Sequence, residues 1–326
     1  MTDPHQDIGV VIIGRNEGAR LLACLASLGA DCARVVYVDS GSTDGSVAAA
    51  QNAGAEVVTL DTDVPFTAAR ARNAGIAALE QGAVPTFVQF IDGDCALDTQ
   101  WIATARRFLT DNPDVAVVCG RRRERFPDAS VYNRMCDAEW DTPVGETQAC
   151  GGDALMRWQA LDAVGGYNPD LIAGEEPEMC LRMRRKGWKI WRLDAEMTLH
   201  DAAMTRLGQF WKRAERAGYA AAEGRAMYGI APEKHGVTAT RRAVLWGMVI
   251  PLIIVIGLLV AGPIALLLML IYPAQVARLA LREGGGRFAW EQATLLTLGK
   301  FAETRGIVAY HWRRWRGHQA QLIEYK

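Results

Sequence analysis

The sequence predicts an α/β fold built on a mainly parallel, doubly wound sheet and followed by an apolar helical segment near the C-terminus. In the first third of the chain, strand-like runs alternate with stretches whose apolar residues recur at helical spacing, as in consecutive βαβ units. Much farther along, residues 243–277 contain no charged residue at all. That stretch exceeds the ~20 residues that one membrane-spanning helix needs.

The expected elements follow one another in a regular order along the first part of the chain. Each expected strand is a short run rich in apolar residues, and each expected helix has apolar residues three and four positions apart. We expect strands at 8–13, 34–38, 56–60 and 85–92, and helices at 19–28, 46–53 and 67–81. Beyond residue 120 the pattern is less regular, with a helix expected at 157–164, a turn at 165–169 and a helix from Glu175 to about Gly187.

Composition and charge exclude several classes of function. The chain has 326 residues, enough for one large domain and an appendage, and its net charge of -1 favours no nucleic-acid partner. Its 7 cysteines include no C-x-x-C pair, so we expect reduced thiols in the core of a cytosolic domain and no zinc site. Residues 1–7 lack a basic run followed by an apolar core, so we expect no secretory signal there.

Polar clusters follow three of the expected strands at the point where each strand ends. They are Arg15-Asn16-Glu17 after the first strand, residues 39–45 after the second, and Asp92-Gly93-Asp94 after the fourth. The carboxyl ends of parallel strands share one edge of a sheet, and ligands bind at that edge in such folds. We therefore expect the three clusters to form a single site.

Asp92 and Asp94 provide the main chemical signal at this edge. Two carboxylates one residue apart after a buried strand can hold Mg²⁺ or Mn²⁺, which prefer oxygen ligands and bridge to phosphate oxygens. A departing nucleoside diphosphate needs such help. The alternative is a pair of surface aspartates in an ordinary turn.

Asp39 is a second candidate, because its carboxylate could accept a hydrogen bond from a nucleobase or a ribose. The alternative is a structural role as a helix cap or in an Asx turn. Ser42, Thr43 and Asp44 are better placed to cap the helix that follows, which would leave Asp39 available to a ligand.

Carboxylates and a histidine in the second half of the chain extend the list of candidates. Glu175 and Glu176 precede a helix and could act as a general base, although carboxylates there also complement a helix N-terminus. His200 could be a third metal ligand, or a structural hydrogen-bonding group. Arg72 lies in an expected helix and could equally face solvent.

Gln209, Arg213 and Arg216 lie at positions i, i+4 and i+7, so a helix would place them on one face. That face could bind a diphosphate. It could also belong to an amphipathic helix lying on a membrane, and the two roles are compatible.

The uncharged stretch is flanked by Arg241-Arg242 and Arg278 and is interrupted by Gly262-Pro263 near its middle. Basic residues on both flanks favour a short hairpin with both ends in the cytoplasm. A single broken or re-entrant span and a buried pair of soluble helices are the alternatives. The tail that follows, with the basic-aromatic run 311–316, suits an anchor on anionic lipid better than a site for RNA.

Taken in order, these motifs resemble those of the family-2 glycosyltransferases with the GT-A fold, over residues 8–219. The matching segments are Val11-Ile12-Ile13-Gly14-Arg15-Asn16-Glu17, Val38-Asp39-Ser40-Gly41-Ser42-Thr43-Asp44-Gly45, Arg72-Asn73-Ala74-Gly75, Asp92-Gly93-Asp94, Cys150 to Arg157 with Gly165 to Asn168, and Gly174 to Arg182. The chain departs from the family pattern where Ile13 and Arg15 replace a proline and an aromatic residue, where Asp153 replaces an asparagine, and where Glu176 replaces an aspartate. Gln209, Arg213 and Arg216 match the family's diphosphate clamp only loosely, which favours transfer of a single sugar over polymerisation.

The resemblance implies an inverting hexosyltransferase that uses a nucleotide-sugar donor with Mg²⁺ or Mn²⁺. It implies Glu176 as the catalytic base, with Glu175 beside it, and Asp92, Asp94 and His200 as metal ligands. For the donor, the implied residues are Arg15, Glu17, Asp39, Arg72, Asp92, Gln209, Arg213 and Arg216.

The apolar segment adds an expectation about the acceptor and the location. We expect a saccharide linked to polyprenyl diphosphate, used in polysaccharide biosynthesis at the inner membrane by a catalytic domain that faces the cytoplasm. The expected domains are a GT-A domain at 1–235, a membrane-associated hairpin at 241–282 and an amphipathic tail at 283–326. Transfer to polyprenyl phosphate itself and a catalytically silent membrane scaffold are the alternatives.

Overall fold

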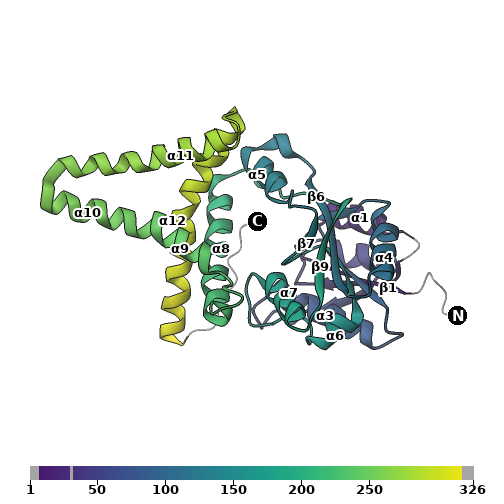
Figure 1. Cartoon of the computed structure of the whole chain (residues 1–326). Helices are drawn as coiled ribbons and strands as arrows, with labels where there is room; N and C mark the ends of the chain where they lie inside the picture. Colours follow the sequence, from purple (N-terminus) through teal and green to yellow (C-terminus); the bar gives the residue numbers. More distant parts are fainter. Residues whose placement is uncertain (1–6, 30–31, 318–326) are drawn as a thin grey trace. The chain divides into compact units, whose positions relative to one another are not determined.

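The computed structural model describes residues 7–29 and 32–317 (Figure 1). The expectation about a secretory signal therefore lies almost entirely outside the described residues, as does the last part of the expected tail. The chain forms two compact units, Met1–Pro127 with Cys136–Ala203, and Asp128–Met135 with Met204–Lys326. The domain limits expected at residues 235, 241 and 283 stay a prediction.

The first unit is built around a mixed, mainly parallel sheet, as the sequence predicts. Its described strands are β1 Ile8–Gly14, β2 Cys32–Asp39, β3 Glu56–Thr59, β4 Phe87–Asp92, β5 Cys95–Leu97, β6 Val115–Glu124, β7 Gly145–Thr147, β8 Ala154–Arg157 and β9 Lys189–His200. They lie in the order β3-β2-β1-β4-β8-β6-β9-β5, with β7 beside β9. The first four strands pair in parallel, whereas β8 runs antiparallel to both β4 and β6.

Helices pack on both faces of this sheet, which makes it doubly wound (Figure 1). The helices are α1 Ala19–Ala26, α2 Ser46–Asn52, α3 Ala68–Glu80, α4 Trp101–Asp111, α6 Trp158–Ala163 and α7 Glu175–Arg185. A further helix, α5 Val131–Glu139, is divided between the two units. On one face, a Cβ on Gly75 of α3 would lie 2.3 Å from Val11 Cγ1 of β1, so glycine allows the helix to approach closely. On the other face, Trp101 Nε1 of α4 donates to Gln89 Oε1 of β4 at 2.9 Å.

The helices and strands expected in the first part of the chain are confirmed within a few residues. Local signals account for the ends that shift. The helix at 67–81 begins at Ala68 because the Thr67 side chain caps it, accepting from the Arg70 N–H at 3.1 Å. The strand expected from residue 85 begins at Phe87, whose N–H donates to the Asp7 carbonyl at 2.9 Å.

The cysteines lie where the sequence predicts. None of the seven forms a disulfide, and all except Cys32 are buried.

The second unit is helical. Its elements are α8 Leu207–Tyr228, α9 Val237–Val244, the π-helical turn η3 Leu245–Val249, α10 Ile250–Ala261, the 3-10 helix η4 Gly262–Leu270, α11 Ile271–Arg282 and α12 Arg287–Arg316. Glycines bring α8 and α12 into backbone contact. A Cβ on Gly306 would lie 1.9 Å from the Glu215 carbonyl oxygen, and a Cβ on Gly218 would lie 2.0 Å from that of Glu303.

The apolar segment folds back on itself as the expected hairpin, with α10 in one arm and η4 and α11 in the other (Figure 1). The chain reverses at Gly262, whose φ of 70° favours glycine. At the open end of the hairpin, Tyr272 Oη donates to the Trp246 carbonyl at 2.8 Å. The basic residues on the two flanks therefore lie at the same end of the hairpin.

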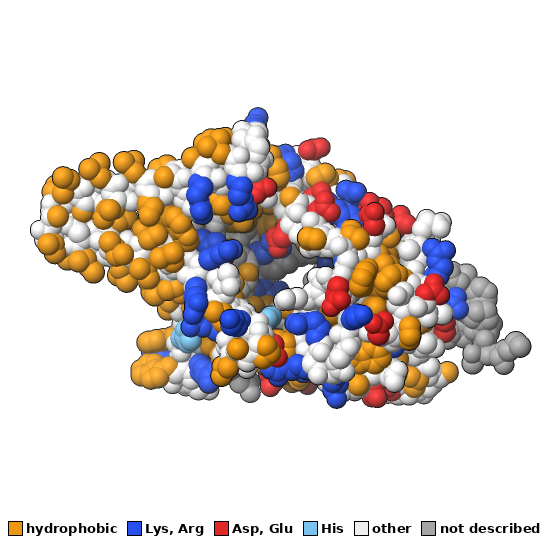
Figure 2. Space-filling view, in the orientation of Figure 1, with side chains coloured by type: hydrophobic (Ala, Val, Ile, Leu, Met, Phe, Trp, Pro, Cys, Tyr) orange, Lys and Arg blue, Asp and Glu red, His pale blue; other side chains and the backbone are white. Residues whose placement is uncertain are grey.

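The hairpin exposes its apolar side chains, and Figure 2 shows them covering its surface. The helical stretch Val237–Arg282 is long and apolar enough to cross a membrane, judged by length and composition alone. Only 11% of its most apolar residues are buried in the structure. A buried pair of soluble helices, one of the alternatives left open by the sequence, does not fit this exposure.

Candidate functional site

The three strand ends that carry polar clusters lie level at one edge of the sheet. Gly14 of β1 lies beside Asp39 of β2, and Ile13 of β1 lies beside Asp92 of β4. The clusters are therefore neighbours, as the parallel arrangement predicts.

The loop after β1 is joined to the loop after β2 by side-chain hydrogen bonds. Asn16 Oδ1 accepts from the Thr43 N–H at 2.7 Å. Glu17 forms an ion pair with Arg20 at 2.7 Å, and Arg15 is exposed beside them. Arg15 and Glu17 thus flank the edge of the site, on opposite sides of a residue that holds the two loops together.

The Asp39 carboxylate is buried and hydrogen-bonded within its own loop, and its expected contact with a nucleobase or a ribose stays a prediction. Only 1% of the residue is exposed. Its Oδ2 accepts from the N–H groups of Gly41 and Ser42 at 3.0 and 2.9 Å, and its Oδ1 accepts from Tyr37 Oη at 3.2 Å. The backbone amides of the turn point inward, so the carboxylate organises its own loop in an Asx-type turn.

Carboxylates and an imidazole gather where β4 and β9 end. His200 Nε2 lies 3.4 Å from Asp94 Oδ2, because β5 pairs with the end of β9. The third member is Asp153, just before β8, whose Oδ1 accepts from the Asp92 N–H at 3.1 Å. Thr198 donates to the other oxygen of Asp153 at 2.8 Å. The antiparallel strand β8 thus brings a third aspartate beside the two predicted from the sequence.

This cluster fits a divalent cation. Two groups of side chains bring their ligand atoms within 4.8 Å of one another, Asp94 with Cys95 and His200, and Asp92 with Cys95 and Asp153. Burial and the nearby Arg122 cation lower the pKa of His200, which favours the neutral imidazole that binds metals. Burial raises the pKa of Cys95, so the carboxylates and the imidazole are the ligands that suit Mg²⁺ or Mn²⁺.

Arg72 of α3 joins this cluster to the two glutamates that begin α7. Its side chain is 3% exposed and contacts three carboxylates. Arg72 Nη2 lies 3.0 Å from Asp92 Oδ1, and Nη1 lies 2.9 and 2.8 Å from the Oε1 atoms of Glu175 and Glu176. Burial opposes the charge of this guanidinium, but the carboxylates of Glu176 and Asp92 raise its pKa well above the ordinary value. Arg72 is therefore buried, and the alternative that its side chain faces solvent is excluded.

Glu176 has the electrostatic character of a base that works near neutral pH. Burial and the adjacent Glu175 carboxylate raise its pKa to about 7, while Arg72 acts in the opposite direction. Gly174, with a φ of 81°, turns the chain so that both glutamates enter the first turn of α7. The first turn of a helix favours negative charge, so Glu175 also satisfies the structural role considered for it.

The segment from Gly165 to Asn168, one of the matching motifs, is hydrogen-bonded to the helix that carries Arg72. Asn73 Nδ2 donates to the Tyr167 carbonyl at 2.7 Å, and the Tyr167 N–H donates to Asn73 Oδ1 at 2.9 Å. A Cβ on Gly152 would lie 2.8 Å from Arg72 Nη2 and 3.0 Å from Asp92 Oδ2. The glycine therefore allows the backbone to pass directly over the Arg72–Asp92 ion pair.

Sequence reasoning missed Arg122 as a member of the site. Arg122 Nη2 lies 3.3 Å from Asp92 Oδ2, and Nη1 lies 3.5 Å from Asp153 Oδ2. Its guanidinium lies over the ring of Trp140 at 5.0 Å, and that ring meets His200 edge-on at 4.7 Å. The signal was a polar stretch at the end of the apolar strand β6, the same signal that identified Asp39 and Asp92.

Gln209, Arg213 and Arg216 all lie on α8, in the second unit. Gln209 Oε1 accepts from the N–H groups of Thr205 and Arg206, both at 3.0 Å, and so caps the start of the helix. The carboxylate cluster belongs to the first unit. A diphosphate clamp at α8 stays a prediction.

Comparison with known proteins finds a family model and curated relatives that match part of the chain. Residues 9–153 match the model of glycosyl transferase family 2. The chain is 27% identical to the succinoglycan biosynthesis protein ExoA of Rhizobium meliloti over 217 residues, covering 62% of this chain and 66% of that protein. It is 26% identical to the pre-mycofactocin glycosyltransferase of Mycobacterium tuberculosis over 213 residues, covering 60% of this chain and 43% of that protein. The chain thus spans less than two thirds of the length of these relatives.

Solved structures share the fold. The mannosyltransferase PcManGT from Pyrobaculum calidifontis, in complex with GDP-Man and Mn²⁺, aligns with a TM-score of 0.62 at 18% identity, over 94% of this chain and 88% of that one. Glucosyl-3-phosphoglycerate synthase from Mycobacterium tuberculosis, in complex with phosphoglyceric acid, aligns with a TM-score of 0.51 at 19% identity, over 69% and 81% of the two chains. At these identities the likeness concerns the fold alone, and the fold is of the GT-A type.

Proposed function

We propose that the chain is a glycosyltransferase that moves one sugar from a nucleotide-diphosphate sugar onto a lipid-linked saccharide, a proposal supported by the match of residues 9–153 to the model of glycosyl transferase family 2 and by the names of its relatives. The acceptor in this proposal is carried on polyprenyl diphosphate, and the transfer inverts the anomeric carbon. The product would be an intermediate of polysaccharide biosynthesis at the cytoplasmic face of the inner membrane.

One observation carries the proposed chemistry. A single buried guanidinium, that of Arg72, contacts Asp92 on one side and the Glu175–Glu176 pair on the other. The cation-binding cluster and a carboxylate with a raised pKa therefore flank one fixed point at the carboxyl edge of the sheet. Inverting transfer needs this combination, since charge develops on the leaving diphosphate while a proton leaves the acceptor hydroxyl.

Glu176 is the base in this proposal. Its carboxylate accepts the proton of the acceptor hydroxyl while that oxygen forms a bond to the anomeric carbon of the donor. The bond between the anomeric carbon and the diphosphate oxygen breaks in the same step, and the diphosphate leaves with the electron pair. Arg72 orients Glu176, and its positive charge favours the ionised carboxylate.

The donor side is assigned to the edge formed by the loops after β1 and β2. In the proposal Asp39 holds the loop that meets the nucleotide, with Arg15 and Glu17 at its margin. Asp92, Asp94 and His200 would hold Mg²⁺ or Mn²⁺, which would stabilise the charge of the leaving diphosphate. Gln209, Arg213 and Arg216 are proposed to contact the diphosphate from α8.

The hairpin supports the lipid-linked acceptor. Leu259 and Val260 at its far end are each 83% exposed, which is unfavourable in water and favourable in a bilayer. Trp246 and Tyr272 at its open end are side chains that concentrate at membrane interfaces. One relative bears the name of succinoglycan biosynthesis, which fits an exopolysaccharide pathway.

The proposal is tested by a transfer assay with the detergent-purified protein. UDP- and GDP-sugars are offered with Mn²⁺ and an acceptor of either polyprenyl diphosphate carrying a sugar, polyprenyl phosphate, or a water-soluble saccharide. We expect transfer to the first acceptor, dependent on the metal and reduced by about 10²–10⁴-fold in Glu176→Gln. Glu80→Gln makes the same change at an exposed position of α3 and should leave the rate unchanged.

Other outcomes would correct particular parts of the proposal. Equal rates for Glu176→Gln and the unmodified protein would remove Glu176 as the base. Transfer to sugar-free polyprenyl phosphate alone would replace the proposed acceptor, and transfer to soluble saccharides alone would exclude a lipid acceptor.

A further inference from the structure

Two contacts join the arms of the hairpin, one at its open end and one toward the turn. At the open end, the rings of Trp246 and Tyr272 lie 6.0 Å apart and a hydrogen bond joins the residues. Toward the turn, a Cβ on Gly257 would lie 2.9 Å from Ala265 Cβ, so the backbones pass close to each other there. These two contacts bound a gap between the side chains of the two arms.

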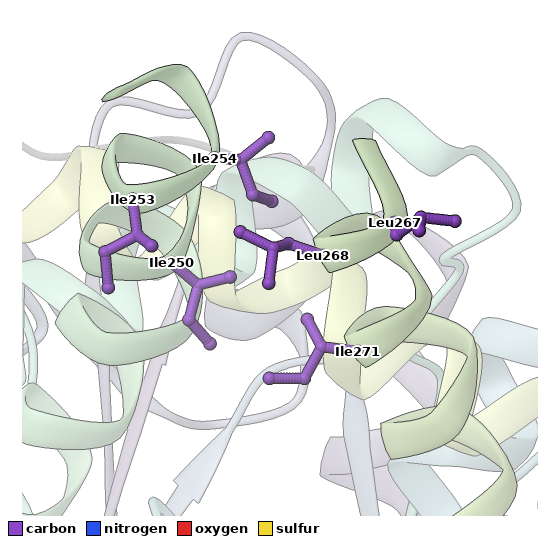
Figure 3. A pocket seen from close by; sticks show the side chains of 6 residues that line it. All are labelled: Ile250, Ile253, Ile254, Leu267, Leu268 and Ile271. Atoms are coloured by element: carbon purple, nitrogen blue, oxygen red, sulfur yellow. The ribbon is translucent and has the colours of Figure 1, made fainter. Parts of the chain in front are cut away.

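A cavity of about 270 Å³ fills this gap. Its walls are Ile250, Ile253, Ile254, Leu267, Leu268 and Ile271. Figure 3 shows Leu268 and Ile271 of one arm pointing toward the other arm, whereas Leu267 points outward. These side chains carry no polar atom, so water inside would find no hydrogen-bonding partner among them. Most of the lining residues are themselves exposed, so the cavity opens to the surface of the hairpin, where hydrocarbon can enter it. The volume is close to the ~300 Å³ at which pockets for small molecules begin.

Arginines lie on both flanks of the open end. Arg241 and Arg242 precede Trp246, and Arg278 follows Tyr272, all three with exposed side chains. An anionic head group near these residues would leave its hydrocarbon tail next to the cavity. The charges and the cavity therefore suit one amphiphile, with an anionic head and an apolar chain.

We propose that this cavity binds the head-proximal isoprenoid units of the polyprenyl diphosphate acceptor, an inference that rests on the proposed function. The cavity lies between the two contacts that join the arms, so it takes only a limited length of chain. A chain with regularly spaced methyl branches fills such a space better than a straight acyl chain. Its stiffer backbone also loses less conformational entropy on binding. The hairpin then selects the acceptor by its lipid and holds it at the membrane.

The direct test is photocrosslinking in nanodiscs of neutral and anionic phospholipid, with a photoreactive farnesyl diphosphate analogue as the probe. We expect crosslinks to the residues that line the cavity, identified by mass spectrometry, and competition by polyprenyl diphosphate but not by anionic phospholipid. Competition by phospholipid alone, or crosslinks spread over the outer surface of the hairpin, would overturn the proposal.

Two tryptophan variants make the test specific. Ile254 is 8% exposed and faces the cavity, so Ile254→Trp should fill the cavity and lower crosslinking by roughly tenfold. Leu252 on the same helix is 52% exposed and does not line the cavity, so Leu252→Trp should leave crosslinking unchanged. Ile254→Ala, which enlarges the cavity without adding bulk, shows whether any loss follows from misfolding, because it should retain crosslinking. Equal crosslinking in Ile254→Trp and Leu252→Trp would overturn the proposal.

Transfer kinetics separate this inference from the proposed function. If the unmodified protein uses lipid acceptors, lengthening the isoprenoid chain should lower KM, and Ile254→Trp should remove that advantage without changing kcat. An unchanged chain-length dependence in Ile254→Trp would contradict the cavity as the binding site. If no lipid acceptor is used at all, the proposed function fails, and the crosslinking result still decides whether the cavity binds an isoprenoid.

Discussion

Glu176 and its neighbours show how single residues set the chemistry of the site. The carboxylate lies between a like charge from Glu175 and an opposite charge from Arg72. Burial and Glu175 raise its pKa, and the result, about 7, lies where small changes in its surroundings alter its protonation at physiological pH.

A pH dependence follows for the transfer rate. A base must be deprotonated, so kcat/KM should rise through an apparent pKa of about 7 and fall at lower pH. Glu175→Gln removes the like charge and should move this limb to lower pH. Arg72→Met removes the cation and should move it to higher pH. The pH dependence of kcat/KM, measured for the unmodified protein and the two variants, shows the direction of each shift. Identical pH profiles would show that Glu176 does not control the rate.

Arg122 is held by the same cluster and leads to a second prediction at this scale. Its guanidinium lies 3.3 Å from Asp92 and 3.5 Å from Asp153, so Arg122→Gln would leave the buried carboxylate of Asp153 and the partly exposed one of Asp92 without this positive charge. We expect the free energy of unfolding without metal to fall by about 3 kcal/mol. Mn²⁺ should then raise the melting temperature more than in the unmodified protein, because the ion replaces the missing charge.

Arg123→Gln is the matched control for that experiment. Arg123 lies next to Arg122 on β6 and pairs with Glu196, but both side chains are about half exposed. Such surface ion pairs contribute about 0–1 kcal/mol, so the control should melt close to the unmodified protein. Equal behaviour of the two variants, with and without Mn²⁺, would show that Arg122 does not balance the aspartates.

Among the elements, the α8–α12 pair depends most clearly on particular residues. Both helices approach until their backbones touch, which only glycine allows at Gly218 and Gly306. Gly306→Ala should destabilise the second unit by about 1–3 kcal/mol, because its Cβ would lie 1.9 Å from the Glu215 carbonyl oxygen. Thermal unfolding in detergent measures the effect.

Gly208→Ala provides the comparison within the same helix pair. A Cβ on Gly208 of α8 would meet nothing within 4 Å, so the substitution should be neutral or stabilise the helix by up to about 1 kcal/mol. If Gly306→Ala melted as Gly208→Ala does, close packing of α8 on α12 would not be needed for stability.

The hairpin is an element whose length constrains its function. From Trp246 to Ala261 the helix extends about 22 Å at ~1.5 Å per residue. This is less than the ~30 Å hydrocarbon core of a bilayer. With Trp246 at the interface, the turn at Gly262 would therefore lie inside the bilayer, and both flanks would stay on the same side.

At the scale of the whole molecule, membrane attachment should depend on this hairpin. Leu259→Asp with Val260→Asp places two charges at its most exposed apolar positions, each of which costs about 2.5–3.5 kcal/mol inside a bilayer. We expect this variant to move from the membrane fraction to the soluble fraction, whereas the unmodified protein should resist extraction by salt.

Leu22→Asp is the control for attachment, because Leu22 is 54% exposed on α1 of the other unit. It should remain with the membrane. Recovery of the unmodified protein in the soluble fraction without detergent would contradict a membrane role for the hairpin.

Local patterns in the sequence determined the strands and helices of the first part of the chain, the polar clusters at the strand ends and the apolar segment. These features depend on the spacing and composition of neighbouring residues, which the sequence gives directly. Asp92, Asp94 and Glu176 could be singled out as candidates because each stands at the end or the beginning of such an element.

Only the tertiary structure decided which of these residues meet. Arg122 and Asp153 join the site because β8 runs antiparallel between β4 and β6, a pairing between segments far apart in the sequence. Arg72 binds carboxylates and Asp39 accepts hydrogen bonds from its own turn. The direction in which each side chain points depends on the residues packed around it, which the local sequence does not give. The hairpin likewise closes through Gly257 and Ala265, whose contact no local pattern predicts, since small residues fit many surroundings.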